Sequence, residues 1–138
     1  MSNTAGFEVI DHTADWSLRV FGPDLAALFE QAALGMASLL VADLELVNNG
    51  VERPFAFDEF DTETLLVEWL SELAYWAETE RLIFTQFHFE AIDETSLQAT
   101  ARGGHVTELQ KHIKAVTFHN LAITPTPTGL ETTIVFDV

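Results

Sequence analysis

The chain has 138 residues, 48% of them hydrophobic, with eleven Phe and three Trp. These values fit one globular domain over residues 1–138 and exclude a disordered chain, and no apolar run reaches the about 20 residues that span a membrane. Six Lys and Arg oppose 22 Asp and Glu, and a net charge of −16 excludes strong direct binding to nucleic acid, which depends on cationic side chains. The chain has no Cys and no secretory leader at its start, so we expect a cytoplasmic protein without disulfides.

The first part of the sequence predicts two extended segments on either side of an acidic loop. Residues 7–10 and 16–21 are the extended segments, and the second alternates polar and apolar residues. The loop between them reads Asp11-His12-Thr13-Ala14-Asp15. Gly22-Pro23 ends the second segment.

Two amphipathic helices follow. Apolar residues recur with helical spacing from Leu25 to Leu40, and Asp24 is placed to cap the start of this helix. After a turn at residues 48–50, residues 51–57 predict a strand. A second helix begins at Asp61 or Thr62; Leu and Trp side chains form one of its faces and acidic residues the other.

The remainder of the chain has the period of two that is typical of strands. Strands are predicted at 82–92, 96–102, 112–123 and 130–138, and the Pro- and Gly-rich turn at 124–129 predicts a hairpin between residues 114–123 and 130–137. Two helices and about six strands, each with one apolar face, predict an α+β fold. We expect two layers, a mainly antiparallel sheet covered on one side by both helices.

Charge is unevenly distributed along the sequence. Residues 58–80 hold eight acids and no base, whereas three of the six cations lie between Arg102 and Lys114. We therefore expect a polarised surface whose acidic side suits a basic protein partner.

Acidic residues near both ends of the chain outline a cation site. If the strand after Asp15 lies beside the last strand, Asp15, Asp137 and the α-carboxylate of Val138 can supply three hard oxygen donors to one ion. The alternative is structural, because an Asp between strands usually bonds its own turn and Asp137 can be an ordinary surface acid.

The other motifs give no clear chemistry. His105, His112 and His119 are spaced by seven residues, but an odd spacing places two residues of one strand on opposite faces, which argues against a shared zinc ion. The sequence contains no glycine-rich phosphate loop and no nucleophile elbow.

Four segments together resemble the archease family. They are the loop at 11–15, the helix entry Gly22-Pro23-Asp24-Leu25 and its continuation to Ala33, Lys114-Ala115-Val116-Thr117-Phe118-His119, and the final Phe136-Asp137-Val138. They occur in the family's order over nearly the whole chain. Residues 103–113 are fewer than commonly precede the Lys-Ala-Val-Thr motif, so the resemblance assigns no role to His105 or His112.

The resemblance implies a protein cofactor of the RtcB-type ligase of tRNA splicing. Such a cofactor is not an enzyme itself; it assists guanylylation of the ligase and keeps it turning over, like a chaperone. By motif position, Asp15, Asp137 and Val138 would bind a divalent ion, Ca²⁺ in the first place and Mg²⁺ as the alternative. Asp11, His12, Lys114 and His119 would contact the ligase. Two other functions remain open, a metal-dependent phosphoester hydrolase and a general chaperone or RNA-modification adaptor.

Overall fold

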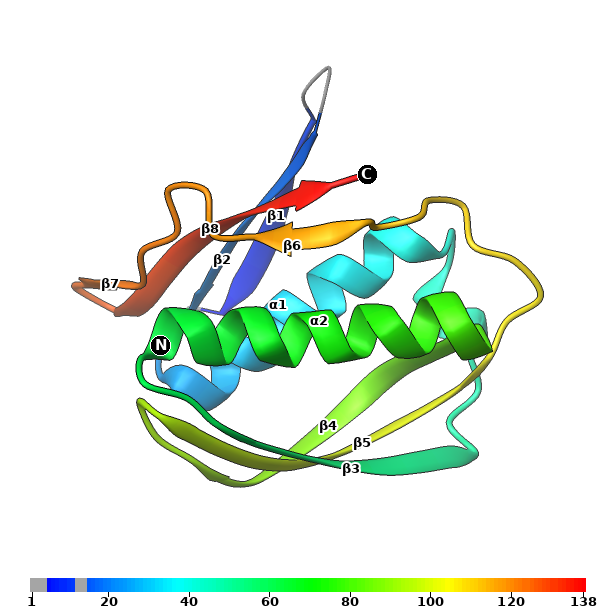
Figure 1. The fold of residues 1–138 in the computed structure, drawn as a ribbon, viewed down its shortest axis with the longest axis horizontal. Coiled ribbons are helices and arrows are strands. Elements are labelled where there is room, and N and C mark those ends of the chain that lie inside the picture. Colours follow the sequence, from blue (N-terminus) through cyan, green and yellow to red (C-terminus); the bar gives the residue numbers. More distant parts are fainter. Residues whose placement is uncertain (1–4, 12–14) are drawn as a thin grey trace.

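The chain folds into three layers, with two helices held between two antiparallel sheets (Figure 1). The computed structural model describes residues 5–11 and 15–138. In chain order the elements are β1 (Gly6–Asp11), β2 (Trp16–Gly22), α1 (Leu25–Leu40), the 3₁₀ turn η1 (Leu44–Leu46), β3 (Val51–Asp58), α2 (Thr62–Glu80), β4 (Leu82–Ile92), β5 (Ser96–His105), β6 (Ala115–Thr117), β7 (Thr124–Thr126) and β8 (Gly129–Asp137).

The upper sheet in Figure 1 joins the two ends of the chain. Its strand order is β1-β2-β8-β6, and β7 also pairs with β8. The lower sheet has the order β3-β5-β4 and is built from the middle of the chain. β8 therefore lies between β2 and β6. Asp15, next to β2, and the C-terminal residues thus lie at the same sheet.

Both helices begin where the sequence predicts. The Asp24 carboxylate accepts a hydrogen bond from the Ala27 N–H, and Asp61 accepts one from the Thr64 N–H. These bonds satisfy N–H groups that have no partner inside the helix. Hydrogen bonds from the Thr64 hydroxyl and N–H also lower the pKa of Asp61. Within the described residues, no helix combines the length and apolar character needed to cross a bilayer.

The core lies between the layers and is centred on Trp69. This side chain is fully buried, and its indole N–H donates to the Phe29 carbonyl at 3.1 Å. Its ring packs edge-on against Phe55 and Phe87, at 5.5 and 5.7 Å between centroids. One aromatic cluster thus ties α1, α2 and the lower sheet together.

The α+β class is confirmed, and the expected layering is corrected. We expected one sheet with both helices on one side, but the strands form two sheets and the helices contact both. The reason is that β2 pairs with β8 and not with β3, so the strands at the two ends of the chain form one sheet and β3, β4 and β5 form another. Each sheet then has its own apolar face to bury, and the helices supply apolar surface to both.

The expected hairpin of residues 114–123 is also corrected. Of residues 114–123, only Ala115–Thr117 pairs with β8. The other strand that pairs with this part of β8 is β7, which lies within the predicted turn of residues 124–129 and leaves only residues 127 and 128 between β7 and β8. Asn120 has a φ of 52°, and the Leu121 N–H donates to the Phe118 carbonyl at 3.0 Å. Asn tolerates this left-handed conformation better than most residues do, so a turn interrupts the predicted strand.

Candidate functional site

Asp15 and Asp137 lie at the same end of the upper sheet, where the β2–β8 pairing stops. β2 and β8 are antiparallel, and their last pair is Trp16 with Phe136. Continuing this register by one residue sets Asp15 opposite Asp137. Residues that oppose each other in an antiparallel pair have Cα atoms about 4.5–5.5 Å apart and side chains on the same face. We call this end of the sheet, with Asp15, Asp137 and Val138, the carboxylate tip.

The carboxylate tip leaves both acids available to a ligand. Asp15 is half-buried and Asp137 is exposed. Neither side chain forms a hydrogen bond or an ion pair with any residue in the ranges 5–11 and 15–138. Two like charges opposite each other in a sheet are unfavourable, and a cation between them removes the repulsion.

The donors at the carboxylate tip suit a hard cation only in part. Carboxylate oxygens are the donors that Ca²⁺ and Mg²⁺ prefer, but Ca²⁺ takes six to eight oxygens and Mg²⁺ takes six. Across residues 5–11 and 15–138, no three His, Asp or Glu side chains are grouped so that they could hold an ion. Asp15 and Asp137 alone therefore do not complete the ligand set of either ion.

The other predicted contact residues lie around this end of the sheet. Asp11 ends β1 opposite Trp16. The Lys114 N–H donates to the Asp137 carbonyl at 2.7 Å, and the exposed Lys114 side chain lies beside α2. His119 is exposed in the turn after β6, next to Asn120. His12 lies outside the described residues.

Sequence reasoning missed a basic contact next to the carboxylate tip. The Lys111 ammonium lies 4.3 Å from the centre of the ring of Trp16, the residue that follows Asp15 in the chain. Such a cation–π contact holds the loop before β6 against the end of β2. The cluster of cations between residues 102 and 114 was visible in the sequence, but nothing local links it to Trp16.

The three histidines considered for zinc have separate partners. His105 bonds the Glu80 carbonyl through Nδ1 at 2.9 Å, and His112 bonds the Glu78 carboxylate at 3.0 Å. His112 lies before β6, not on a strand. Since His119 also lies outside β6, the odd-spacing argument, which assumed one strand for His112 and His119, does not apply to them.

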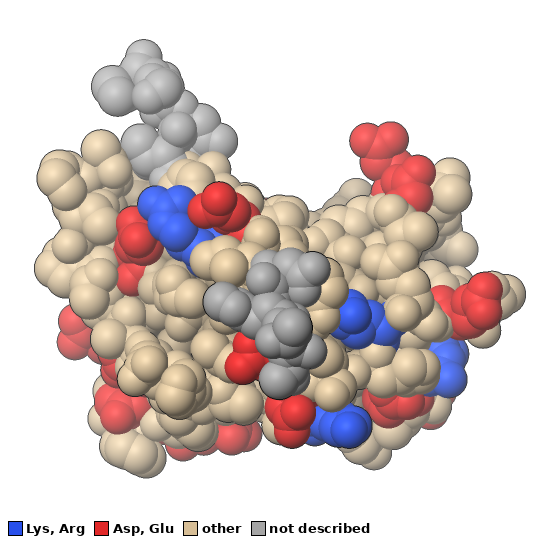
Figure 2. All heavy atoms as spheres, turned by 90° about the horizontal axis from the view of Figure 1, so that it is seen from above, with Lys and Arg blue, Asp and Glu red and all other residues tan. Residues whose placement is uncertain are grey.

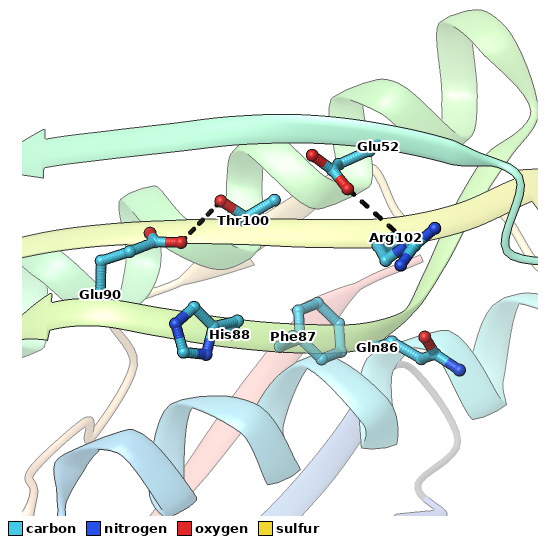
Figure 3. Close-up of a pocket in the computed structure, with 7 residues that line it drawn as sticks. All are labelled: Glu52, Gln86, Phe87, His88, Glu90, Thr100 and Arg102. Carbon is cyan, nitrogen blue, oxygen red and sulfur yellow. Dashed lines mark hydrogen bonds and ion pairs between the residues drawn. The ribbon is translucent and has the colours of Figure 1, made fainter.

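A second polar surface lies on the outer face of the lower sheet. Its shallow hollow of about 400 Å³ is lined by side chains of β3, β4 and β5 (Figure 3). Glu52 pairs with Arg102 at 3.7 Å, and Glu90 accepts a hydrogen bond from Thr100 at 2.7 Å. These polar groups satisfy one another, so this surface shows less demand for a ligand than the carboxylate tip.

Viewed from above, the molecule is not uniformly acidic. Figure 2 shows a largely uncharged surface on which acidic and basic side chains are interspersed. On the upper sheet, Arg19 in β2 donates to the Glu131 carboxylate in β8 through two nitrogens, at 3.1 and 3.2 Å.

Known proteins are similar to this chain in sequence and in fold. Residues 7–138 match the model of the Archease protein family (MTH1598/TM1083). A protein archease of Methanosarcina mazei is 35% identical over 96% of this chain and 95% of its own, and one of Methanothermobacter thermautotrophicus is 37% identical over 86% and 88%.

Two solved structures share the fold. The solution structure of Methanobacterium thermoautotrophicum protein 1598 has a TM-score of 0.79 at 32% identity, covering 96% of this chain and 99% of that one. The crystal structure of a Thermotoga maritima archease, described as a possible chaperone, has a TM-score of 0.61 at 20% identity over 95% and 96%. The second likeness concerns the fold alone.

Proposed function

The chain belongs to the archease family, and on this premise we propose that it is a protein cofactor of an RtcB-type RNA-splicing ligase. In this role it assists guanylylation of the ligase and sustains multiple turnover, without acting on RNA itself. A divalent ion, Ca²⁺ or Mg²⁺, is held by Asp15, Asp137 and the Val138 carboxylate. The observation that supports the proposal is the β2–β8 register, whose last pair is Trp16 with Phe136, so that Asp15 and Asp137 are the next residue of each strand.

The incomplete ligand set favours a cofactor over an independent enzyme. A half-site with two side-chain carboxylates leaves coordination positions open for groups of another molecule. The active site of a ligase that uses GTP and metal ions offers phosphate oxygens and a shared cation. The carboxylate tip can therefore deliver or hold an ion at such a site.

The charge of the chain supports a protein partner over RNA. With 22 acids against six bases, long-range attraction draws the chain toward a basic cleft and away from phosphates. Lys114, the first residue of the Lys-Ala-Val-Thr motif, lies next to the carboxylate tip, because its backbone N–H donates to the Asp137 carbonyl. It is suited to contact an acidic or phosphate group at the partner's active site.

A ligation assay with matched Asp variants tests this proposal. We expect Asp15→Ala and Asp137→Ala to reduce stimulation of multiple-turnover ligation by a cognate ligase more than tenfold, together with its guanylylation. Asp58→Ala is the control, because Asp58 is also an exposed last residue of a strand but lies on the lower sheet. It should stimulate as the wild type does.

Two outcomes would contradict the proposal. If the Asp15→Ala and Asp137→Ala proteins are folded by circular dichroism and stimulate fully, the carboxylate tip is not the working surface. If the protein alone hydrolyses a phosphoester and loses this activity with Asp15→Ala, the site is that of a hydrolase.

A further inference from the structure

The outer face of the upper sheet carries a row of uncharged side chains beside the carboxylate tip. Side chains alternate between the two faces of a strand, and the fully buried Leu18 and Ile134 mark the inner face of β2 and β8. Their neighbours in the chain therefore point outward. The register aligns four such residues across β1, β2, β8 and β6, which we call the uncharged row: Ile10, Ser17, Val135 and Thr117.

The uncharged row offers packing surface and no partner for a charged group. Ile10, Val135 and Thr117 are half-buried. Ser17, the smallest of the four, is only 7% exposed between its larger neighbours. The Thr117 hydroxyl donates to the Val135 carbonyl at 3.0 Å, which leaves its methyl group for contact. Figure 2 looks onto this side of the molecule, where uncharged residues predominate. Such a surface suits an apolar side chain of another molecule.

The charges on the two sides of the uncharged row differ. On one side, Asp137 lies two residues beyond Val135 on the same face, about 7 Å along the strand. Its carboxylate has no ion pair or hydrogen bond with residues 5–11 or 15–138. On the other side, Arg19 bonds Glu131 and lies 3.8 Å from Glu8, so charge there is already compensated. A molecule that covers the row therefore needs positive charge on the side of the tip and none on the side of Arg19.

We propose that the uncharged row is a contact surface for the protein partner that shares the ion at the carboxylate tip. The partner presents an apolar side chain of about the size of Leu or Phe to Ser17 and Val135, with its cation site about 7 Å away along β8. This inference rests on the proposed function, because it takes the ligase as the partner. It adds that binding needs an apolar contact on the sheet face as well as the two acids.

The first test observes the row in the unmodified protein. The chain is labelled at the methyl groups of Ile, Leu and Val, and an unlabelled cognate ligase is added with Ca²⁺. Saturation of the ligase protons should attenuate the methyl signals of Ile10 and Val135 in the complex. The control is Ile92, which is also half-buried but lies in β4 of the lower sheet, and its signal should keep its intensity. If Ile10 and Val135 are unaffected in the complex, the proposal is wrong.

Matched variants measure the contact without changing the net charge. Val135→Asn should weaken binding of the ligase about tenfold in calorimetry, because a single contact at the centre of an interface often has an effect of this size. Ca²⁺ binding to the free variant should stay within about twofold of wild type. The control is Ala56→Asn on the outer face of β3, an exposed apolar residue that should tolerate the change in ligase binding. Wild-type ligase binding by folded Val135→Asn would overturn the proposal, and so would an equal loss of Ca²⁺ binding.

Failure of this inference can be told apart from failure of the proposed function. If the wild type neither binds nor stimulates the ligase, both are wrong. If the wild type stimulates and Asp15→Ala does not, but folded Val135→Asn stimulates and binds fully, the inference alone is wrong. If the wild type is a dimer in sedimentation experiments and Val135→Asn is a monomer, a second copy covers the row, which also contradicts the inference. Should Val135→Asn misfold, the methyl experiment on the wild type decides.

Discussion

The carboxylate tip and the outer face of the lower sheet are both polar surfaces, but their charged groups differ in whether they have partners. On the lower sheet, Glu52 faces Arg102, and Glu90 is held by Thr100 (Figure 3). At the tip, Asp15 and Asp137 directly follow the last pair of the β2–β8 register, Trp16 with Phe136, and neither has an opposite charge beside it among the described residues. The hollow is on the lower sheet, whereas Asp15 and Asp137 at the tip have no ion pair or hydrogen bond within residues 5–11 and 15–138. This contrast predicts that a cation binds at the tip and not in the hollow.

The comparison predicts that divalent ions stabilise the protein through the tip alone. At about 100-fold over the dissociation constant, Ca²⁺ should raise the free energy of unfolding by about 2.7 kcal/mol. Asp15→Asn should remove most of this rise because it deletes one anionic ligand, and Glu52→Gln on the lower sheet should leave it intact. Denaturant unfolding with and without Ca²⁺ measures both. An equal rise in all three proteins would show that the ion only screens charge.

A smaller effect is expected when no divalent ion is present. Asp137→Asn should then raise the free energy of unfolding by about 0.2–1 kcal/mol, because it relieves the repulsion between two carboxylates that oppose each other. Unfolding in the presence of a chelator tests this. A loss of stability would mean that Asp137 makes a favourable interaction in the apo protein, and the contrast between the two regions would be broken.

The smallest effect is expected on the lower sheet. Arg102→Gln removes an ion pair whose side chains are 55% and 60% exposed, so it should lower the free energy of unfolding by at most about 1 kcal/mol. It should not change the response to Ca²⁺ or the stimulation of the ligase. If Arg102→Gln impaired stimulation as strongly as Asp15→Ala, the lower sheet would belong to the functional surface.

The elements that the sequence predicted well depend on local information. The first helix shows its apolar stripe and its cap at Asp24 within the segment itself, and the turn at Asp93 joins two strands that are adjacent in the chain. Hydrogen bonds from the backbone and side chains of Thr95 and Ser96 hold this turn and lower the pKa of Asp93. Such features do not depend on the rest of the molecule.

The features that could not be predicted from the sequence depend on pairing between residues far apart in the chain. The division into two sheets follows from β2 joining β8, which are more than a hundred residues apart in the chain. The contact between Lys111 and Trp16 has the same origin. The candidate acids were visible near both ends, but their common site depends on a register that no local pattern specifies.

The carboxyl carbons of Asp15 and Asp137 offer the most direct test of whether the two acids share one ion. In a Ca²⁺ titration followed by ¹³C NMR of the side-chain carboxyl groups, both signals should shift together with a single dissociation constant. The signal of Asp58 on the lower sheet should remain in place. Shifts of only one tip carboxylate, different dissociation constants for the two, or an equal shift of Asp58 would contradict a shared site.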